Sequence, residues 1–210
     1  MTGILLDGPL DARRGVILAH GAGAPMDSTF MSAFAEGIGA AGIRVARFEF
    51  PYMTRRREDG KRRPPDRRPV LIECWRATIV GLYQTGIPRE RLFIGGKSMG
   101  GRIASLIADE AGVAGVVCVG YPFHPPGKPE RTRIEHLVSL RTPTLIVQGE
   151  RDPLGTREDL AGYALSAAIH LHWLADGDHS FKPRKASGRT EMQNWEEGIQ
   201  AVVEFVEHDF

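Results

Sequence analysis

The sequence predicts a three-layer α/β fold, in which helices cover both faces of a mainly parallel sheet of about six or more strands. Short apolar runs alternate along the chain with longer segments of helical periodicity, which is typical of repeated βαβ units. The run GVILAH, residues 15–20, has the composition of a buried strand. The 210 residues are enough to enclose a core, and 42% hydrophobic with 25% charged residues is ordinary for a globular protein. We expect residues 1–210 to form a single domain.

Charge and cysteine content narrow the class of protein. The formal net charge is +1, so no strong field attracts the chain to nucleic acid or to a membrane surface. Cys74 and Cys118 lie in separate apolar segments, which is typical of free buried thiols in a reducing compartment. The N-terminal residues 1–15 lack the pattern of a signal peptide, and no apolar run approaches the ~18 residues of a membrane span. These features predict a cytoplasmic protein that binds neither nucleic acid nor membrane, and they leave the oligomeric state open.

Each element is predicted from its hydrophobic period. Phe30, Phe34 and Ile38 recur at helical spacing, and Pro69 fits the first turn of another helix. The expected strands are residues 15–20, 43–50, 91–96, 113–121, 142–149 and 168–174. The expected helices are residues 28–41, 69–84, 99–111, 156–168 and 194–206. Residues 51–69 interrupt this order with eight Lys or Arg and four prolines, which predicts a surface loop.

The stretch FIGGKSMGGR, residues 93–102, admits two chemical interpretations. Its GKS ends like a phosphate-binding P-loop, but the first glycine of that motif would fall at Arg91, and the intervening residues belong to a strand. The same stretch fits G-x-S-x-G, the strand-to-helix turn that exposes a nucleophilic serine. Gly96 and Gly100 supply the small residues that this sharp turn needs on either side of Ser98. A glycine-rich turn in which Ser98 only caps the helix is the simpler alternative.

A serine nucleophile needs a base and a group that orients the base. In an α/β-hydrolase the order along the chain is serine, acid, histidine. Asp152 follows an expected strand, at the sheet edge where ligand-facing loops lie, and His179 follows the next strand. The remaining acidic candidates are Glu150, Asp159, Asp176 and Asp178. His170 and His172 share a strand face, but no carboxylate or cysteine cluster joins them, so we expect neither metal nor cofactor.

The oxyanion formed during attack needs backbone amides aimed at it. Met99, directly after the nucleophile, is one expected donor. The glycine-rich HGAGAP after the first strand supplies the second, for which Ala22 is favoured over Gly21, while His20 braces the loop. GAGAP does not continue as a dinucleotide-binding fingerprint.

Four motifs in order, HGAGA, GKSMGG, QGERDP and DGDHSF, resemble the α/β-hydrolase superfamily. More narrowly, PYM with RRPPDR, GYPFHPPGKPE and RTPTLIVQGERDP is similar to small hydrolase-like proteins related to testis-expressed protein thirty, grouped with dienelactone-hydrolase-like proteins. The resemblance covers nearly the whole chain. It implies a hydrolase core with no large cap domain, and Ser98, Asp152 and His179 as nucleophile, acid and base. It implies no particular substrate. Dienelactone hydrolases usually carry a cysteine nucleophile, so Ser98 argues against that reaction.

Two segments bear on the substrate. The basic loop, residues 51–69, is either a solvated loop or a partial lid whose guanidinium groups face an acidic substrate. The stiff YPFHPPG, residues 121–127, is expected to place Tyr121, Phe123 and His124 at the pocket, unless it is only a structural turn.

The sequence therefore predicts a serine hydrolase, esterase- or thioesterase-like, acting on a small-molecule ester through an acyl-enzyme on Ser98. Acyl transfer and peptidase activity would use the same residues. The rival from another class is a catalytically silent protein-interaction module on the hydrolase fold, because fold alone does not fix function.

Overall fold

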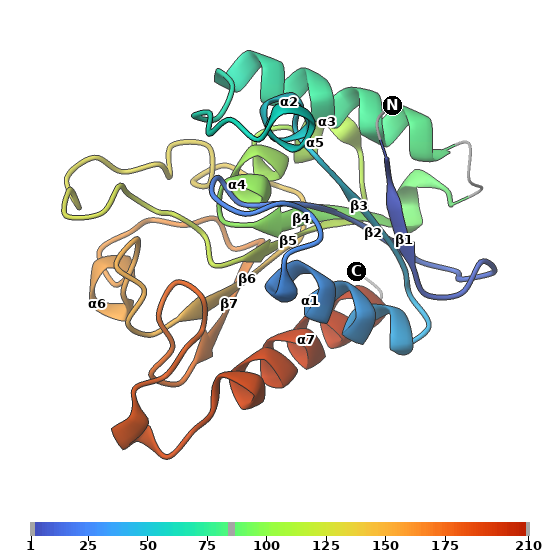
Figure 1. Cartoon of the computed structure of the whole chain (residues 1–210). Helices are drawn as coiled ribbons and strands as arrows, with labels where there is room; N and C mark the ends of the chain where they lie inside the picture. The colour runs from blue at the N-terminus through green and yellow to red at the C-terminus, as the bar shows by residue number, and fades with distance from the viewer. Residues whose placement is uncertain (1–2, 84–86, 209–210) are drawn as a thin grey trace.

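The computed structural model describes residues 3–83 and 87–208, and its centre is a twisted, mainly parallel sheet (Figure 1). Within those residues the sheet has seven strands in the order β1-β3-β2-β4-β5-β6-β7. Their bounds are β1 Leu5–Asp7, β2 Gly15–Ala19, β3 Arg44–Phe48, β4 Leu92–Lys97, β5 Gly115–Val119, β6 Thr144–Gly149 and β7 Ile169–Leu174. Among these seven strands of the described residues, only β1 pairs antiparallel, with β3. The predicted parallel sheet is confirmed, and β1, too short to show a period, is an addition at its edge.

Helices cover both faces of the sheet, as predicted, with α1 and α7 on one side and α3 and α4 on the other (Figure 1). The helices are α1 Thr29–Ala40, α2 Pro51–Asp59, α3 Arg68–Tyr83, α4 Met99–Ser105, α5 Ala108–Ala111, α6 Arg157–Leu160 and α7 Glu191–Glu207. Two short 3-10 turns occupy Arg89–Arg91 and Lys185–Ser187. For the helix expected at residues 69–84, the expected last residue, Gln84, lies outside the described residues.

Two apolar cores form because strand side chains alternate between the faces. In β2, Val16 and Leu18 join the core under α1 and α7, whereas Ile17 and Ala19 join the core under α3 and α4. All five residues of β2 are buried, and so are all five of β5, as expected for inner strands of a parallel sheet. This rigid sheet sets the positions of the loops at its carboxyl edge.

The prediction that residues 51–69 form a loop throughout is wrong. Residues 51–59 form helix α2, which begins at Pro51 and ends at Gly60 in the left-handed conformation with φ 72°. Proline in the first turn and glycine after the last turn are local helix signals. The strongly polar composition hid them, because only Tyr52 and Met53 of this helix are buried.

Three other helices differ in length from the expectation. The helix expected at 99–111 is divided, because the amides of Leu106 and Ile107 bond three residues back instead of four. The helix expected at 156–168 ends at Leu160, after which the Ser166 amide bonds to the carbonyl of Leu137. The closing helix begins early, at Glu191, because Thr190 and Gln193 form a capping box.

Both cysteines are free, with Cys118 buried and Cys74 half-buried. Among the described residues, no helix is long and apolar enough to cross a membrane.

Candidate active site

The strand-to-helix turn at Ser98 has the conformation that its glycines predict. Ser98 lies at φ 51° and ψ −112°, a strained backbone region for a residue with a side chain. A Cβ added to Gly96 would lie 2.0 Å from the carbonyl oxygen of Ala19, and one added to Gly100 would lie 2.4 Å from the same atom. The turn can therefore approach β2 this closely only with glycine at both positions, and it presents the Ser98 hydroxyl at the carboxyl edge of the sheet.

Ser98, His179 and Asp152 form a continuous chain of hydrogen bonds. His179 Nε2 lies 2.9 Å from Ser98 Oγ, and His179 Nδ1 lies 2.7 Å from Asp152 Oδ2. Asp152 is fully buried, whereas the His179 side chain is 28% exposed. Because a carboxylate only accepts, Nδ1 carries the proton, and Nε2 is left free to accept the proton of the serine. This is the arrangement in which a serine can be deprotonated.

Asp152 is held by a buried amide that the sequence analysis missed. Gln148 Nε2 donates to Asp152 Oδ2 at 2.9 Å and to the Gly155 carbonyl at 3.1 Å. Gln148 Oε1 accepts from the Tyr121 amide at 2.8 Å. The second oxygen of Asp152 accepts from the amide of Leu154 at 2.9 Å. A glutamine at the end of a buried strand, four residues before the acid, was the available signal.

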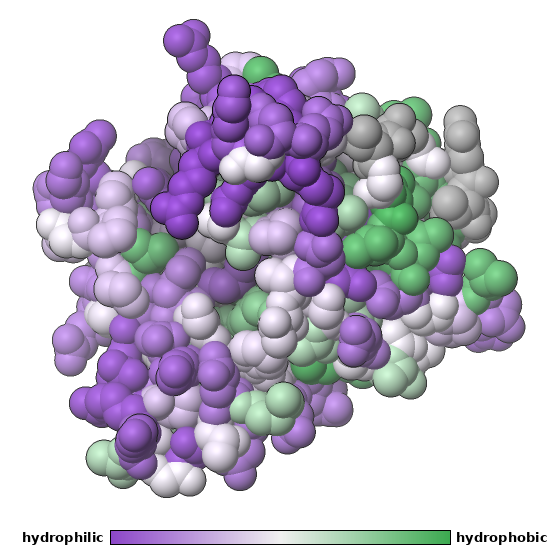
Figure 2. Space-filling view, viewed as in Figure 1, coloured by the Kyte–Doolittle hydropathy of each residue, from purple (hydrophilic) through white to green (hydrophobic). Residues whose placement is uncertain are grey.

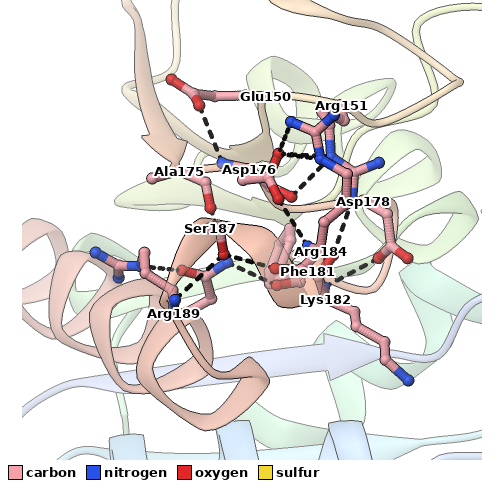
Figure 3. Close-up of polar contacts among 11 residues, drawn as sticks. Glu150, Arg151, Ala175, Asp176, Asp178, Phe181, Lys182, Arg184, Ser187 and Arg189 are labelled. Carbon is pink, nitrogen blue, oxygen red and sulfur yellow. Dashed lines mark hydrogen bonds and ion pairs between the residues drawn. The ribbon is translucent and has the colours of Figure 1, made fainter.

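The loop that carries His179 is fixed by polar contacts on both of its sides (Figure 3). Arg151 pairs with the Asp176 carboxylate at 2.9 Å, and the Asp176 amide donates to Glu150 at 3.0 Å. Asn194 of α7 donates to the carbonyls of Ala175 and Phe181. His179 is therefore held by contacts of its loop to the residues after β6 and to α7. Glu150 acts in this support and does not bond to His179.

The oxyanion loop, residues 20–25, is held through its carbonyl groups. Tyr52 Oη donates to the carbonyl of Ala22 at 3.0 Å, and His20 Nδ1 donates to the carbonyl of Gly21 at 2.7 Å. The Phe50 amide donates to His20 Nε2 at 3.1 Å, which fixes the tautomer, and burial lowers the pKa of His20. His20 is thus a neutral brace. Within the described residues the Ala22 amide donates no hydrogen bond to any group of the protein.

Helix α2 completes the support of this loop and explains part of the basic composition. Arg56 donates to the carbonyl of Gly23 at 3.1 Å, and Arg57 bonds to both Asp27 and Glu49. Figure 2 shows hydrophilic side chains gathered over α2 and the segment that follows it. Those two arginines of the basic segment therefore hold the chain around the oxyanion loop.

Three expected pocket residues are buried beneath the site. Tyr121 and Phe123 are fully buried, and His124 is 3% exposed. Tyr121 Oη donates to the carbonyl of Arg133 at 3.0 Å, and His124 Nε2 lies 3.3 Å from the Asp159 carboxylate. These contacts make YPFHPPG a packed support, with the Tyr121 backbone joined to Asp152 through the Gln148 side chain.

Lys97, directly before Ser98, contacts the loop that carries His179. Its Nζ donates to the carbonyl of His179 at 2.6 Å and lies 5.4 Å from the ring centroid of Phe30 and 5.7 Å from that of Phe181. Burial lowers the pKa of Lys97 to about 8, opposed by the carboxylates of Asp152 and Asp178. The lysine that suggested a phosphate site is therefore a tie between β4 and the His179 loop.

The lowered pKa of Lys97 predicts how stability depends on pH. The folded value, about 8, lies below the ordinary value of 10.5, so between these pH values the unfolded chain binds more protons. Wild type should therefore gain about 2 kcal/mol relative to Lys97→Met between pH 7 and pH 9.5. Urea unfolding of both proteins at the two pH values measures this change. An exposed control, Lys185→Met, should show a constant difference, and a constant difference for Lys97→Met as well would contradict the expectation.

The described residues contain no group of three or more His, Cys, Asp or Glu side chains placed to hold a metal ion. His172 pairs instead with Glu197 of α7 at 3.3 Å.

Comparison with known proteins identifies the class of this fold. Residues 12–207 match the model of the alpha/beta hydrolase domain family. A dienelactone hydrolase from Anabaena variabilis superposes with a TM-score of 0.73 at 22% identity, over 96% of this chain and 89% of that one. An alpha-beta serine hydrolase homologue from Coxiella burnetii gives 0.71 at 16% identity, over 96% and 89%. A serine hydrolase without a lid from Xanthomonas campestris gives 0.70 at 16% identity, over 99% and 90%.

The chain belongs to the alpha/beta hydrolase family. The predicted superfamily and the absence of a large cap are confirmed by this match and by the helix and strand order. Identities this low establish the shared fold, and the chemistry of this chain is argued from its own residues.

Proposed function

We propose that this protein is a serine hydrolase that cleaves a small-molecule ester or thioester. The observation that carries the proposal is the hydrogen-bond chain from Ser98 Oγ through the His179 ring to the buried Asp152. The elbow conformation of Ser98 and the family membership of the chain support it. Each side chain stands at the distance that its chemical role requires.

In the proposed reaction Ser98 Oγ forms a bond to the carbonyl carbon of the ester while its proton passes to His179 Nε2. The carbonyl electrons move to the oxygen, which accepts hydrogen bonds from the Ala22 and Met99 amides. Met99 is the first residue of α4, where the helix offers its amide no acceptor. The imidazolium then protonates the departing alkoxide or thiolate. Water, deprotonated by His179, hydrolyses the acyl-enzyme and restores Ser98.

The rival function, a silent interaction module, has no observation that favours it. That function would use the basic segment and the proline-rich YPFHPPG as its binding surface. Arg55, Arg56 and Arg57 are bonded instead to groups of their own chain.

A fluorophosphonate probe tests the nucleophile directly. It is expected to form one covalent adduct, located on Ser98 by peptide mass spectrometry, because a deprotonated hydroxyl in this elbow attacks phosphorus. Ser98→Ala should show none, whereas Ser139→Ala, a matched change at an exposed serine, should label like wild type. A folded wild-type protein that stays unmodified would contradict the assignment of Ser98 as the nucleophile.

A further inference from the structure

The basic side chains near the site divide into two groups, those that have carboxylate partners and those that have none. Arg55, Arg57 and Arg63 belong to the first group. Their partners are Asp66, Asp27 with Glu49, and Asp59. Pairing of this kind satisfies the guanidinium donors and leaves little positive charge for a ligand. The three side chains are therefore poor candidates for binding an acidic substrate.

Arg102 and Arg133 belong to the second group. Arg102 lies in α4, and its Nε is buried with no hydrogen-bond partner. Within residues 3–83 and 87–208, neither guanidinium donates a hydrogen bond or forms an ion pair. Buried polar atoms without a partner are rare in native proteins, because losing the hydrogen bonds to water is costly. The buried Nε of Arg102 is therefore available to donate to a group from outside the chain.

Hydrogen bonds hold together the two segments that carry Arg102 and Arg133. Ser105 Oγ donates to the Arg102 carbonyl at 2.8 Å and accepts from His136 Nε2 at 2.8 Å. Tyr121 Oη donates to the Arg133 carbonyl at 3.0 Å. These bonds dock the segment that contains Arg133 and His136 onto the C-terminal end of α4, where Ser105 is the last residue. Arg133 then lies beside the helix that begins at the nucleophile.

The charges around Arg102 and Arg133 favour the binding of an anion. Burial first, and then the neighbouring Arg102, lowers the pKa of Arg133. The same two causes lower the pKa of His136 to about 4, so this ring carries no charge at neutral pH. Glu135, the acidic residue nearest in sequence, is exposed and forms no ion pair with either arginine in the part of the chain that the structure describes. Two like charges held together without a carboxylate favour an added anion.

We propose that Arg102 and Arg133 bind an oxyanion group, a carboxylate or a phosphate, carried by the substrate at a short distance from the bond that Ser98 attacks. The inference rests on the proposed hydrolase function and names its substrate class, an ester with a nearby negative charge. Arg102 follows Ser98 by one helical turn, about 6 Å along the axis, which an arginine side chain can span. Both side chains keep partial exposure to solvent. Guanidinium groups match the paired oxygens of carboxylate and phosphate.

A pair of esters that differ only in the charge tests the subsite. Monomethyl adipate and methyl hexanoate share chain length and leaving group, but only the first ends in a carboxylate. Wild type is expected to hydrolyse the adipate ester with a kcat/KM about tenfold higher or more, since hydrogen bonds to a charged group are the strong ones. In Arg102→Gln and in Arg133→Gln the ratio of the two kcat/KM values should fall toward one. The ratio is the readout, because a damaged fold lowers both rates together.

Controls separate the subsite from general charge and from the hydrolase proposal. Arg63→Gln removes an arginine that is already paired with Asp59 and should keep the wild-type ratio. Inhibition by inorganic phosphate compared with adipate shows which oxyanion the site prefers. A wild-type ratio of one or less, or an unchanged ratio in both variants, would overturn the subsite. If neither ester is turned over, the hydrolase proposal fails, and the subsite is then judged by whether adipate or phosphate raises the Tm of wild type but not of Arg102→Gln.

Discussion

Replacing Ser98 with alanine is expected to lower kcat/KM for a short-chain ester by about 10⁵-fold or more, the scale seen when a triad nucleophile is removed. The variant loses the atom that forms the acyl bond, while the amides that bind the oxyanion remain. Folding should be little affected, because alanine at φ 51° bears the same backbone strain that serine bears there. Initial rates and a urea unfolding curve, measured on the same preparation, separate the two effects.

His179→Ala serves as the companion variant, because it removes the base and leaves Ser98 in place. Its loss should be of the same order, since serine and base act as one unit and their effects do not add. Ser139→Ala controls for an exposed serine-to-alanine change and should retain full turnover. Unchanged turnover in both Ser98→Ala and His179→Ala would mean that the catalytic site lies elsewhere on the protein.

The second large effect is expected for Asp152→Asn, which should lower kcat/KM by about 10⁴-fold. Asp152 Oδ2 accepts from His179 Nδ1 and from Gln148 Nε2, while Oδ1 accepts from the Leu154 amide. An asparagine has an NH2 group in place of one of these oxygens. In one orientation this NH2 group faces the Leu154 amide, and in the other it faces His179 and Gln148, so a donor faces a donor either way. With its NH2 group toward His179 Nδ1, the asparagine holds the histidine in the tautomer that cannot accept the proton of Ser98.

Asp109→Asn provides the matched control. Asp109 accepts from the amides of Arg141 and Thr142, away from His179, so the same chemical change there should leave turnover intact. The measurement is a comparison of kcat/KM at neutral pH after both variants have been checked for a wild-type far-UV spectrum. A loss smaller than tenfold in a folded Asp152→Asn protein would remove Asp152 from the role of acid.

The parallel sheet explains why so much of the site was visible in the sequence. Parallel strands end at a common edge, so residues that follow different strands converge there although they are distant in sequence. Ser98, Asp152 and His179 each follow a recognisable apolar run, and the glycines around Ser98 mark the sharp turn. Local pattern and chain order therefore predicted the meeting of these side chains, and the hydrogen bonds of the structure agree with it.

The supports of the site could not be predicted in this way, because each depends on a contact between distant segments with no pattern of its own. Lys97 reaches the carbonyl of His179, 82 positions away, and Arg56 reaches Gly23, 33 positions away. A lysine beside a nucleophile and an arginine in a charged run look the same in sequence whether they are solvated or bonded. Helix α2 was missed for a related reason, since its charged residues conceal the two buried ones.

The bonds between α2 and residues 20–25 join an exposed helix to a loop of the candidate site. The outer side of α2 is exposed, while Tyr52 and Arg56 on the same helix fix the carbonyls of Ala22 and Gly23. In the proposed reaction the Ala22 amide binds the oxyanion, and its aim determines how well developing negative charge is stabilised. An exposed helix that supplies no group to the proposed reaction is thus tied by two hydrogen bonds to the loop that carries a proposed oxyanion donor.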